Sequence, residues 1–178
     1  KEQSGTTHYV TRTGSADVLA LSDSTFQSLN KRAADLRSRK LVAFDPASGK
    51  TLRSIDVAAH AGTAFDGQHL YQLAEDRIQK IDPKTGRVLA TIPAPGGGGD
   101  SGLAWAEGTL WVGQHRGRKI HQVDPQTGAI LRTIESNRVV TGVTWADGEL
   151  WHGTWEGDES DVRRIDPKTG EVLERLEM

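Results

Sequence analysis

A five-residue turn motif, Asp-Pro-x-x-Gly, occurs four times in this 178-residue chain at nearly regular intervals. Its copies begin at Asp45, Asp82, Asp124 and Asp166, so the intervals are 37, 42 and 42 residues. In such a turn the proline presets φ at the second position and the glycine supplies a positive φ at the last. A motif with a steady period indicates that one structural unit is used several times along the chain.

A second set of landmarks recurs in phase with the turns. Each copy lies 40 residues after the previous one and consists of a glycine, an aromatic residue three positions later, and a leucine followed by another aromatic residue. A period of about 40–45 residues with four short strands per period is typical of a β-propeller blade. The landmarks are Gly62, Phe65 and Leu70-Tyr71; Gly102, Trp105 and Leu110-Trp111; and Gly142, Trp145 and Leu150-Trp151.

Within each period, short stretches of alternating apolar and polar residues are separated by turn residues, which favours strands over helix. We therefore predict an all-β chain, a β-propeller of about four four-stranded blades in a single domain, residues 1–178. The blades are expected at residues 8–57, 62–92, 102–134 and 142–178. Either these blades close a ring, or they are part of a larger ring whose open edge further blades would cover.

One segment of the first blade departs from the pattern. Phe26, Leu29, Ala33 and Leu36 recur at helical spacing, so a short helical insertion is predicted near residues 25–38. The segment is locally basic. It is either a solvated helix face or a contact surface for an anion or a partner.

Composition excludes several classes of function. The 22 Lys and Arg nearly balance the 24 Asp and Glu, which argues against a nucleic-acid partner. The chain has no cysteine for a disulfide framework, and no apolar run approaches the roughly 18 residues that indicate a membrane span. The glycine-rich residues 93–100 lack the helix and the Lys-Ser/Thr pair of a nucleotide-binding loop. The chain begins at Lys1, which is compatible with a removed export signal, so a periplasmic or secreted location is favoured over a cytoplasmic one.

The pattern GLAW…LWVG…IDPKTG resembles the bacterial β-propellers grouped with the glutamine cyclotransferases, the YncE-like proteins and the virginiamycin B lyases. The resemblance extends from about Leu41 to the end of the chain. It implies that the innermost strand of each blade lines an axial channel. It also implies that the links between blades share one face with the loops between second and third strands. Because many functions use such blades, the activity stays open.

On that face, the loops of the third and fourth blades carry uncommon side chains at equivalent positions: residues 114–118 align with residues 154–158. Cationic, acidic and aromatic groups that converge on a concave end suit a small polar ligand. Alternatively, the arginines pair with the carboxylates and hold the two loops together. The candidate ligand-binding residues are Gln114, His115, Arg116, Arg118, Asn137, Arg138, His152, Trp155, Glu156 and Asp158.

Some candidates have a simple structural alternative. Trp155 is the tryptophan that departs from the repeat; the other four are expected in the blade core. His152 lies where the third blade has Val112, and it is either a hydrogen-bonded structural residue or part of a site. The acidic group of residues 156–161 offers hard oxygens for calcium, but its spacing is not that of an EF-hand, and a solvated acidic loop is the alternative. We expect no other cofactor or metal.

We therefore predict a binding module whose loops recognise a small polar molecule or a peptide, with oligomers if the chain does not close its own ring. Two enzymatic alternatives follow from the resemblance. A glutamine cyclotransferase has an acidic residue before the glycine that opens an inner strand, where this chain has Ala61, Ser101 and Thr141, with Asp100 one residue away. A metal-assisted lyase would use His115 and Glu156. No His-Glu-x-x-His zinc motif and no Ser-His-Asp order is evident.

Overall fold

The computed structural model describes residues 8–11, 18–21 and 40–178, and every regular element in these residues is a β-strand. The chain divides into two compact units, Lys1–Ala58 and Ala59–Met178, and each is considered by itself. The all-β propeller class predicted from the repeat is confirmed by the blades of the second unit. A single domain over residues 1–178 stays a prediction, and the helical insertion near residues 25–38 lies outside the described residues.

The first unit contains two antiparallel strand pairs. Strand β1 (His8–Thr11) pairs with β2 (Val18–Leu21), and β3 (Leu41–Phe44) pairs with β4 (Thr51–Ile55). The four strands expected in the first blade are therefore present as two separate two-stranded sheets in the described part of the unit.

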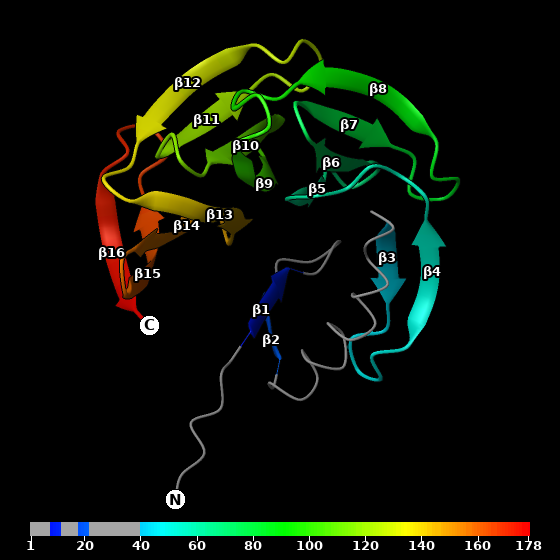
Figure 1. Cartoon of the computed structure of the whole chain (residues 1–178), viewed down its shortest axis with the longest axis horizontal. Helices are drawn as coiled ribbons and strands as arrows, with labels where there is room; N and C mark the ends of the chain where they lie inside the picture. Colours follow the sequence, from blue (N-terminus) through cyan, green and yellow to red (C-terminus); the bar gives the residue numbers. More distant parts are fainter. Residues whose placement is uncertain (1–7, 12–17, 22–39) are drawn as a thin grey trace, which may run out of the picture. The chain divides into compact units, whose positions relative to one another are not determined.

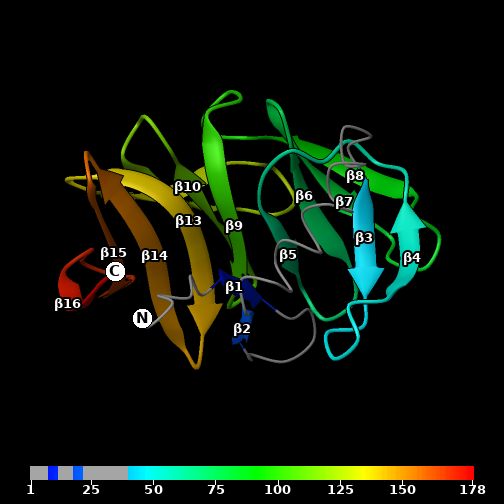
Figure 2. The same ribbon diagram turned by 60° about the horizontal axis from the view of Figure 1, so that its bottom comes forward.

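The second unit holds three four-stranded antiparallel sheets whose strands are paired in chain order (Figure 1). We name them blades 2, 3 and 4, after the predicted order. Their innermost strands lie side by side in chain order (Figure 2). Blade 2 consists of β5 (Thr63–Phe65), β6 (Leu70–Ala74), β7 (Arg77–Ile81) and β8 (Val88–Pro93); blade 3 of β9 (Asp100–Ala106), β10 (Thr109–Gln114), β11 (Lys119–Val123) and β12 (Ile130–Glu135); and blade 4 of β13 (Val139–Ala146), β14 (Glu149–Glu156), β15 (Glu159–Ile165) and β16 (Val172–Glu177).

The repeated Asp-Pro-x-x-Gly motif forms the turn between the third and fourth strands of each blade. In blade 3, the Asp124 carboxylate accepts backbone N–H bonds from Gln126 (2.7 Å) and Thr127 (3.1 Å). The Asp124 carbonyl accepts a bond from the N–H of Gly128 (2.9 Å), whose φ of +76° a residue with a side chain rarely adopts. The motif is thus explained by backbone hydrogen bonds within the turn.

Successive residues of a strand point to opposite faces of its blade, and this alternation builds the core. On β10, Leu110 and Val112 join the apolar cluster between blades 2 and 3, whereas Trp111 joins the cluster between blades 3 and 4. Trp111 stacks on Trp145 with ring centroids 6.3 Å apart. The blades therefore pack face to face, each contributing side chains to two interfaces.

Close approach of the inner strands accounts for the repeated glycines. A Cβ atom on Gly62 would lie 2.3 Å from the backbone nitrogen of Leu103, and one on Gly102 would lie 2.3 Å from that of Val143. A Cβ on Gly142 meets nothing within 4 Å in the second unit. The glycine landmark thus marks where the inner strand of one blade packs on the backbone of the next.

Candidate functional site

Three connections of blades 3 and 4 meet at one edge of the second unit: residues 115–118, 136–138 and 157–158. Arg118 links them. Its Nη2 donates to Oε1 of Glu156 (3.0 Å) and its Nη1 donates to the backbone carbonyl of Asn137 (2.8 Å). Arg118 has a φ of +54°, a backbone conformation that is uncommon for a residue with a side chain. We use the name loop face for these connections together with Gln114, Trp155 and Glu156.

The ion pair between Arg118 and Glu156 is solvent-exposed, since 43% and 45% of the two side chains remain accessible. A pair at this exposure contributes about 0.2–1 kcal/mol to stability. The loops are therefore joined by the predicted arginine–carboxylate contact. Both charged groups nevertheless remain accessible from solvent.

Trp155 differs from the other four tryptophans, as its departure from the repeat predicts. Its side chain is 48% exposed, whereas Trp111 is 3% exposed. Trp105, Trp145 and Trp151 are half-buried in the blades. An apolar ring therefore lies open to solvent at the end of β14. Trp155 and Glu156 are successive residues of this strand, so their side chains point to opposite faces of blade 4.

The remaining residues of the first loop have different environments. The backbone N–H of His115 donates to the carbonyl of Gly99 (2.9 Å), which anchors this loop to the glycine-rich link before blade 3. The side chain of Gln114 lies over Gly117, where a Cβ would be 2.0 Å from its Oε1. Arg116 and, in the second loop, Asp158 are exposed.

Behind the loop face, Asp161 is fully buried and paired with arginines. Arg163 donates to both of its carboxylate oxygens from Nε (2.9 Å) and Nη2 (3.1 Å), and Nε of Arg175 lies 2.7 Å away. Arg138 is 3.6 Å from Asp161 and also pairs with Glu159. Burial alone would raise the pKa of Asp161, but hydrogen bonds from Thr154 and Arg163 outweigh it and lower the pKa.

The acidic group that offered ligands for calcium is largely engaged by arginine. Glu156 pairs with Arg118, while Glu159 and Asp161 pair with arginines of blade 4 and its link. Within the described ranges, no group of three or more histidine and carboxylate side chains is arranged to hold a metal ion.

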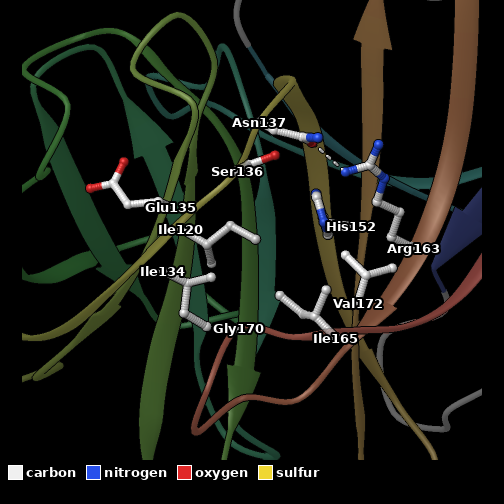
Figure 3. A pocket seen from close by; sticks show the side chains of 10 residues that line it. All are labelled: Ile120, Ile134, Glu135, Ser136, Asn137, His152, Arg163, Ile165, Gly170 and Val172. Atoms are coloured by element: carbon white, nitrogen blue, oxygen red, sulfur yellow. Dashed lines mark hydrogen bonds between the residues drawn. The ribbon is translucent and has the colours of Figure 1, made fainter.

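His152 does not belong to the exposed loops. It is 3% exposed and lines a cavity of about 190 Å³ between blades 3 and 4 (Figure 3). Its Nδ1 has no hydrogen-bond partner, and burial, reinforced by the positive charge of Arg163, lowers its pKa to about 4. Asn137 connects this cavity to the loop face, because its side-chain oxygen accepts a bond from Arg163 (2.6 Å) while its carbonyl binds Arg118.

Asp100 and Arg163 are two candidate functional residues that were not among those predicted from the sequence. Asp100 opens β9, is 7% exposed and accepts one bond from the N–H of Gly96 (3.0 Å), while its Oδ1 has no partner. Burial raises the pKa of Asp100 to about 6. Asp100 could have been selected because it lies one residue before the position expected for the cyclotransferase carboxylate. A register shift between Gly113 and Gln114 pairs Asp100, instead of Ser101, with Gln114. Arg163 could have been selected because it lies two residues after Asp161, on the same face of β15.

Comparisons with solved structures find the same architecture. The chain is similar to the glutaminyl cyclase of Myxococcus xanthus (22% identity, TM-score 0.60, 71% of this chain and 57% of that chain covered). It is similar to the hydrazine synthase of Kuenenia stuttgartiensis (19%, TM-score 0.58, 79% and 43%) and to the Pan2 WD40 domain of Neurospora crassa (11%, TM-score 0.57, 78% and 44%). The chain thus spans 43% to 57% of the length of these structures, and at these identities the likeness concerns the fold alone.

A search of curated proteins found no match. Among the residues that the structure describes, no helix has the length and apolarity to cross a bilayer. The family described as outer membrane protein assembly factor BamB matches residues 74–175, from the end of β6 to β16. This match covers more than half of the 178 residues and includes all three connections of the loop face. The chain therefore belongs to the BamB-like family of β-propeller repeat proteins.

Proposed function

We propose that this chain is a propeller binding module whose loop face recognises a peptide-like or small polar ligand. The observation that carries the proposal is the accessible pair of Arg118 and Glu156, with the exposed Trp155 at the end of the same strand as Glu156. Exposed tryptophan and arginine side chains are enriched at recognition surfaces because they combine a large apolar area with a directed polar group.

The chemistry of the loop face suits a ligand with both charges. An exposed ion pair contributes only about 0.2–1 kcal/mol, so a ligand that replaces it meets a small cost. Arg118 would then bind a carboxylate and Glu156 an ammonium group. The family description names an assembly factor, which supports binding of a polypeptide over catalysis.

Calorimetric titration with the tripeptide Gly-Phe-Gly tests this proposal. We expect the peptide with free termini to bind and the same peptide blocked at both ends to bind about tenfold more weakly. Arg118→Ala should abolish binding. Lys119→Ala, which removes a cation of similar exposure (40%) from its pair with Glu135, should leave binding intact. Equal binding of both peptides, or of both variants, would contradict the proposal.

Asp100 supports a second candidate, the cyclisation of an N-terminal glutamine. A buried carboxyl whose pKa is about 6 and whose Oδ1 is unpaired is suited to proton transfer near neutral pH. The expected result is ammonia release from a glutaminyl peptide by the wild type and loss of this turnover in Asp100→Asn. No release above the uncatalysed rate at high protein concentration would exclude the candidate.

A further inference from the structure

The cavity between blades 3 and 4 has a polar end and an apolar end (Figure 3). Its polar end is formed by His152, Arg163 and Asn137, and its apolar end by Ile120, Ile134 and Ile165. A dry engineered cavity of about 150 Å³ holds a molecule of six carbon atoms. A cavity of about 190 Å³ is therefore large enough for a short hydrocarbon chain with one polar head.

His152 breaks the repeat at the position that faces the preceding blade. Blade 3 has Val112 there, fully buried in the apolar cluster that it shares with blade 2. Blade 2 has Gln72 there, which is also buried. Its side-chain amide is hydrogen-bonded to the Thr63 hydroxyl and to the backbone carbonyls of Ala61 and Leu73. Of these three equivalent side chains, only His152 has a buried nitrogen without a partner.

An unpartnered buried donor or acceptor costs about 1–3 kcal/mol, which a bound polar group would offset. The imidazole is neutral at pH 7 because burial and Arg163 lower its pKa to about 4. A neutral imidazole has one N–H donor. In the tautomer with that proton on Nδ1, the imidazole can donate one hydrogen bond to an acceptor placed in the cavity.

Two charged side chains line the cavity, and Arg163 is the buried one, since Glu135 is 70% exposed and pairs with Lys119. The guanidinium of Arg163 is 5% exposed and fixed by Asp161 on one side and by the side-chain oxygen of Asn137 on the other. Asp161 is shared with Arg175 and Arg138, which also pair with Glu177 and Glu159, so the cluster is balanced in charge and Arg163 is the buried charged group that reaches the cavity. An anionic acceptor is therefore favoured over a neutral one beside Arg163.

We propose that the cavity binds a short-chain aliphatic monocarboxylate, with the carboxylate at His152 and Arg163 and the hydrocarbon between the three isoleucines. A chain of about four to six carbons fits the volume. This binding site is distinct from the loop face and does not depend on the function proposed for it. The shared residue Asn137 gives the two a physical connection.

The test compares three probes by NMR titration of the histidine ring signals and by calorimetry: pentanoate, 1-pentanol and acetate. We expect pentanoate to shift the His152 ring signals and to bind about tenfold more tightly than either of the others. Equal binding of 1-pentanol would show that the carboxylate is not recognised. Equal binding of acetate would show that the apolar end contributes nothing. Either result would overturn the proposal.

Two variants locate the binding. Val172 lies at the mouth of the cavity, half-exposed at the start of β16, and Val172→Phe should fill the cavity and weaken pentanoate binding about tenfold. Val88 has the equivalent position at the start of β8, so Val88→Phe is the matched control and should have no effect. His152→Val restores the residue of blade 3, so it should fold and bind pentanoate no better than 1-pentanol. Unchanged binding in Val172→Phe would place pentanoate elsewhere and overturn the proposal.

Discussion

At the scale of single residues, two buried ionisable groups have pKa values displaced in opposite directions. Burial raises the pKa of Asp100 to about 6, so between pH 4 and 6 the folded chain holds a proton that the unfolded chain has lost. Its contribution to the free energy of unfolding is present at pH 4 and lost as the pH rises through 6. Burial lowers the pKa of His152 from 6.5 to about 4, so its contribution is present above pH 6.5 and lost as the pH falls through 4.

The two contributions to the free energy of unfolding change with pH in opposite directions, so they nearly cancel in the wild type. Removing one group leaves the pH dependence of the other uncompensated. We expect the free energy of unfolding of Asp100→Asn to rise relative to wild type between pH 4 and 6. That of His152→Gln should rise relative to wild type as the pH falls from 6.5 to 4. Shifts of about two pH units correspond to about 3 kcal/mol in each case. Urea unfolding at several pH values measures both.

The exposed Gln126 supplies the control for these measurements, since it does not titrate and Gln126→Ala should keep a constant difference from wild type across the same pH range. A curve for Asp100→Asn or His152→Gln that also runs parallel to wild type would mean that the carboxyl or imidazole group is hydrated in the folded protein.

At the scale of elements, the Asp-Pro-x-x-Gly turn holds the third and fourth strands of a blade together through one carboxylate. Asp124→Ala removes the acceptor for the N–H groups of Gln126 and Thr127 and should lower the free energy of unfolding by about 1–2 kcal/mol. Asp124→Asn keeps one acceptor oxygen and should cost less. Thermal unfolding followed by circular dichroism measures the difference; equal stability of both variants would show that water replaces these bonds.

The same turn shows why the blades could be predicted from the sequence. Its hydrogen bonds and the positive φ of Gly128 are local, so the residues that form the turn also signal it. The exposure of Trp155 and the pairing of Arg118 with Glu156 also follow from departures from the repeat and from the alignment of two neighbouring loops. Both features are properties of short segments.

The cavity and the cluster around Asp161 could not be predicted in this way. Whether His152 has a partner depends on how blade 4 packs against blade 3, and the repeat pattern does not specify the gap between them. Asp161 was grouped with its acidic neighbours in sequence, whereas in the fold its closest charged neighbours are arginines, including Arg175 from the next strand. Charge pairing across strands depends on register, which one sequence leaves open.

At the scale of the whole molecule, the space around each inner-strand glycine indicates whether another blade packs against that strand. A Cβ on Gly102 would lie 2.3 Å from the backbone of Val143, so Gly102→Ala must displace blade 4 from blade 3. Overpacking of this kind costs about 1–3 kcal/mol. Within the second unit a Cβ on Gly142 has nothing within 4 Å, and alanine is favoured over glycine in a strand by about 0.5–1 kcal/mol.

We therefore expect Gly102→Ala to lower the free energy of urea unfolding and Gly142→Ala to leave it unchanged or raise it. Equal destabilisation by both variants would mean that a further blade packs on β13 in solution. Its source would follow from the concentration dependence. A blade from a second copy makes the cost of Gly142→Ala fall on dilution, and light scattering would then show a dimer. A blade from the first unit makes the cost independent of concentration, because the chain then closes its own ring and the neighbour of Gly142 is covalently attached.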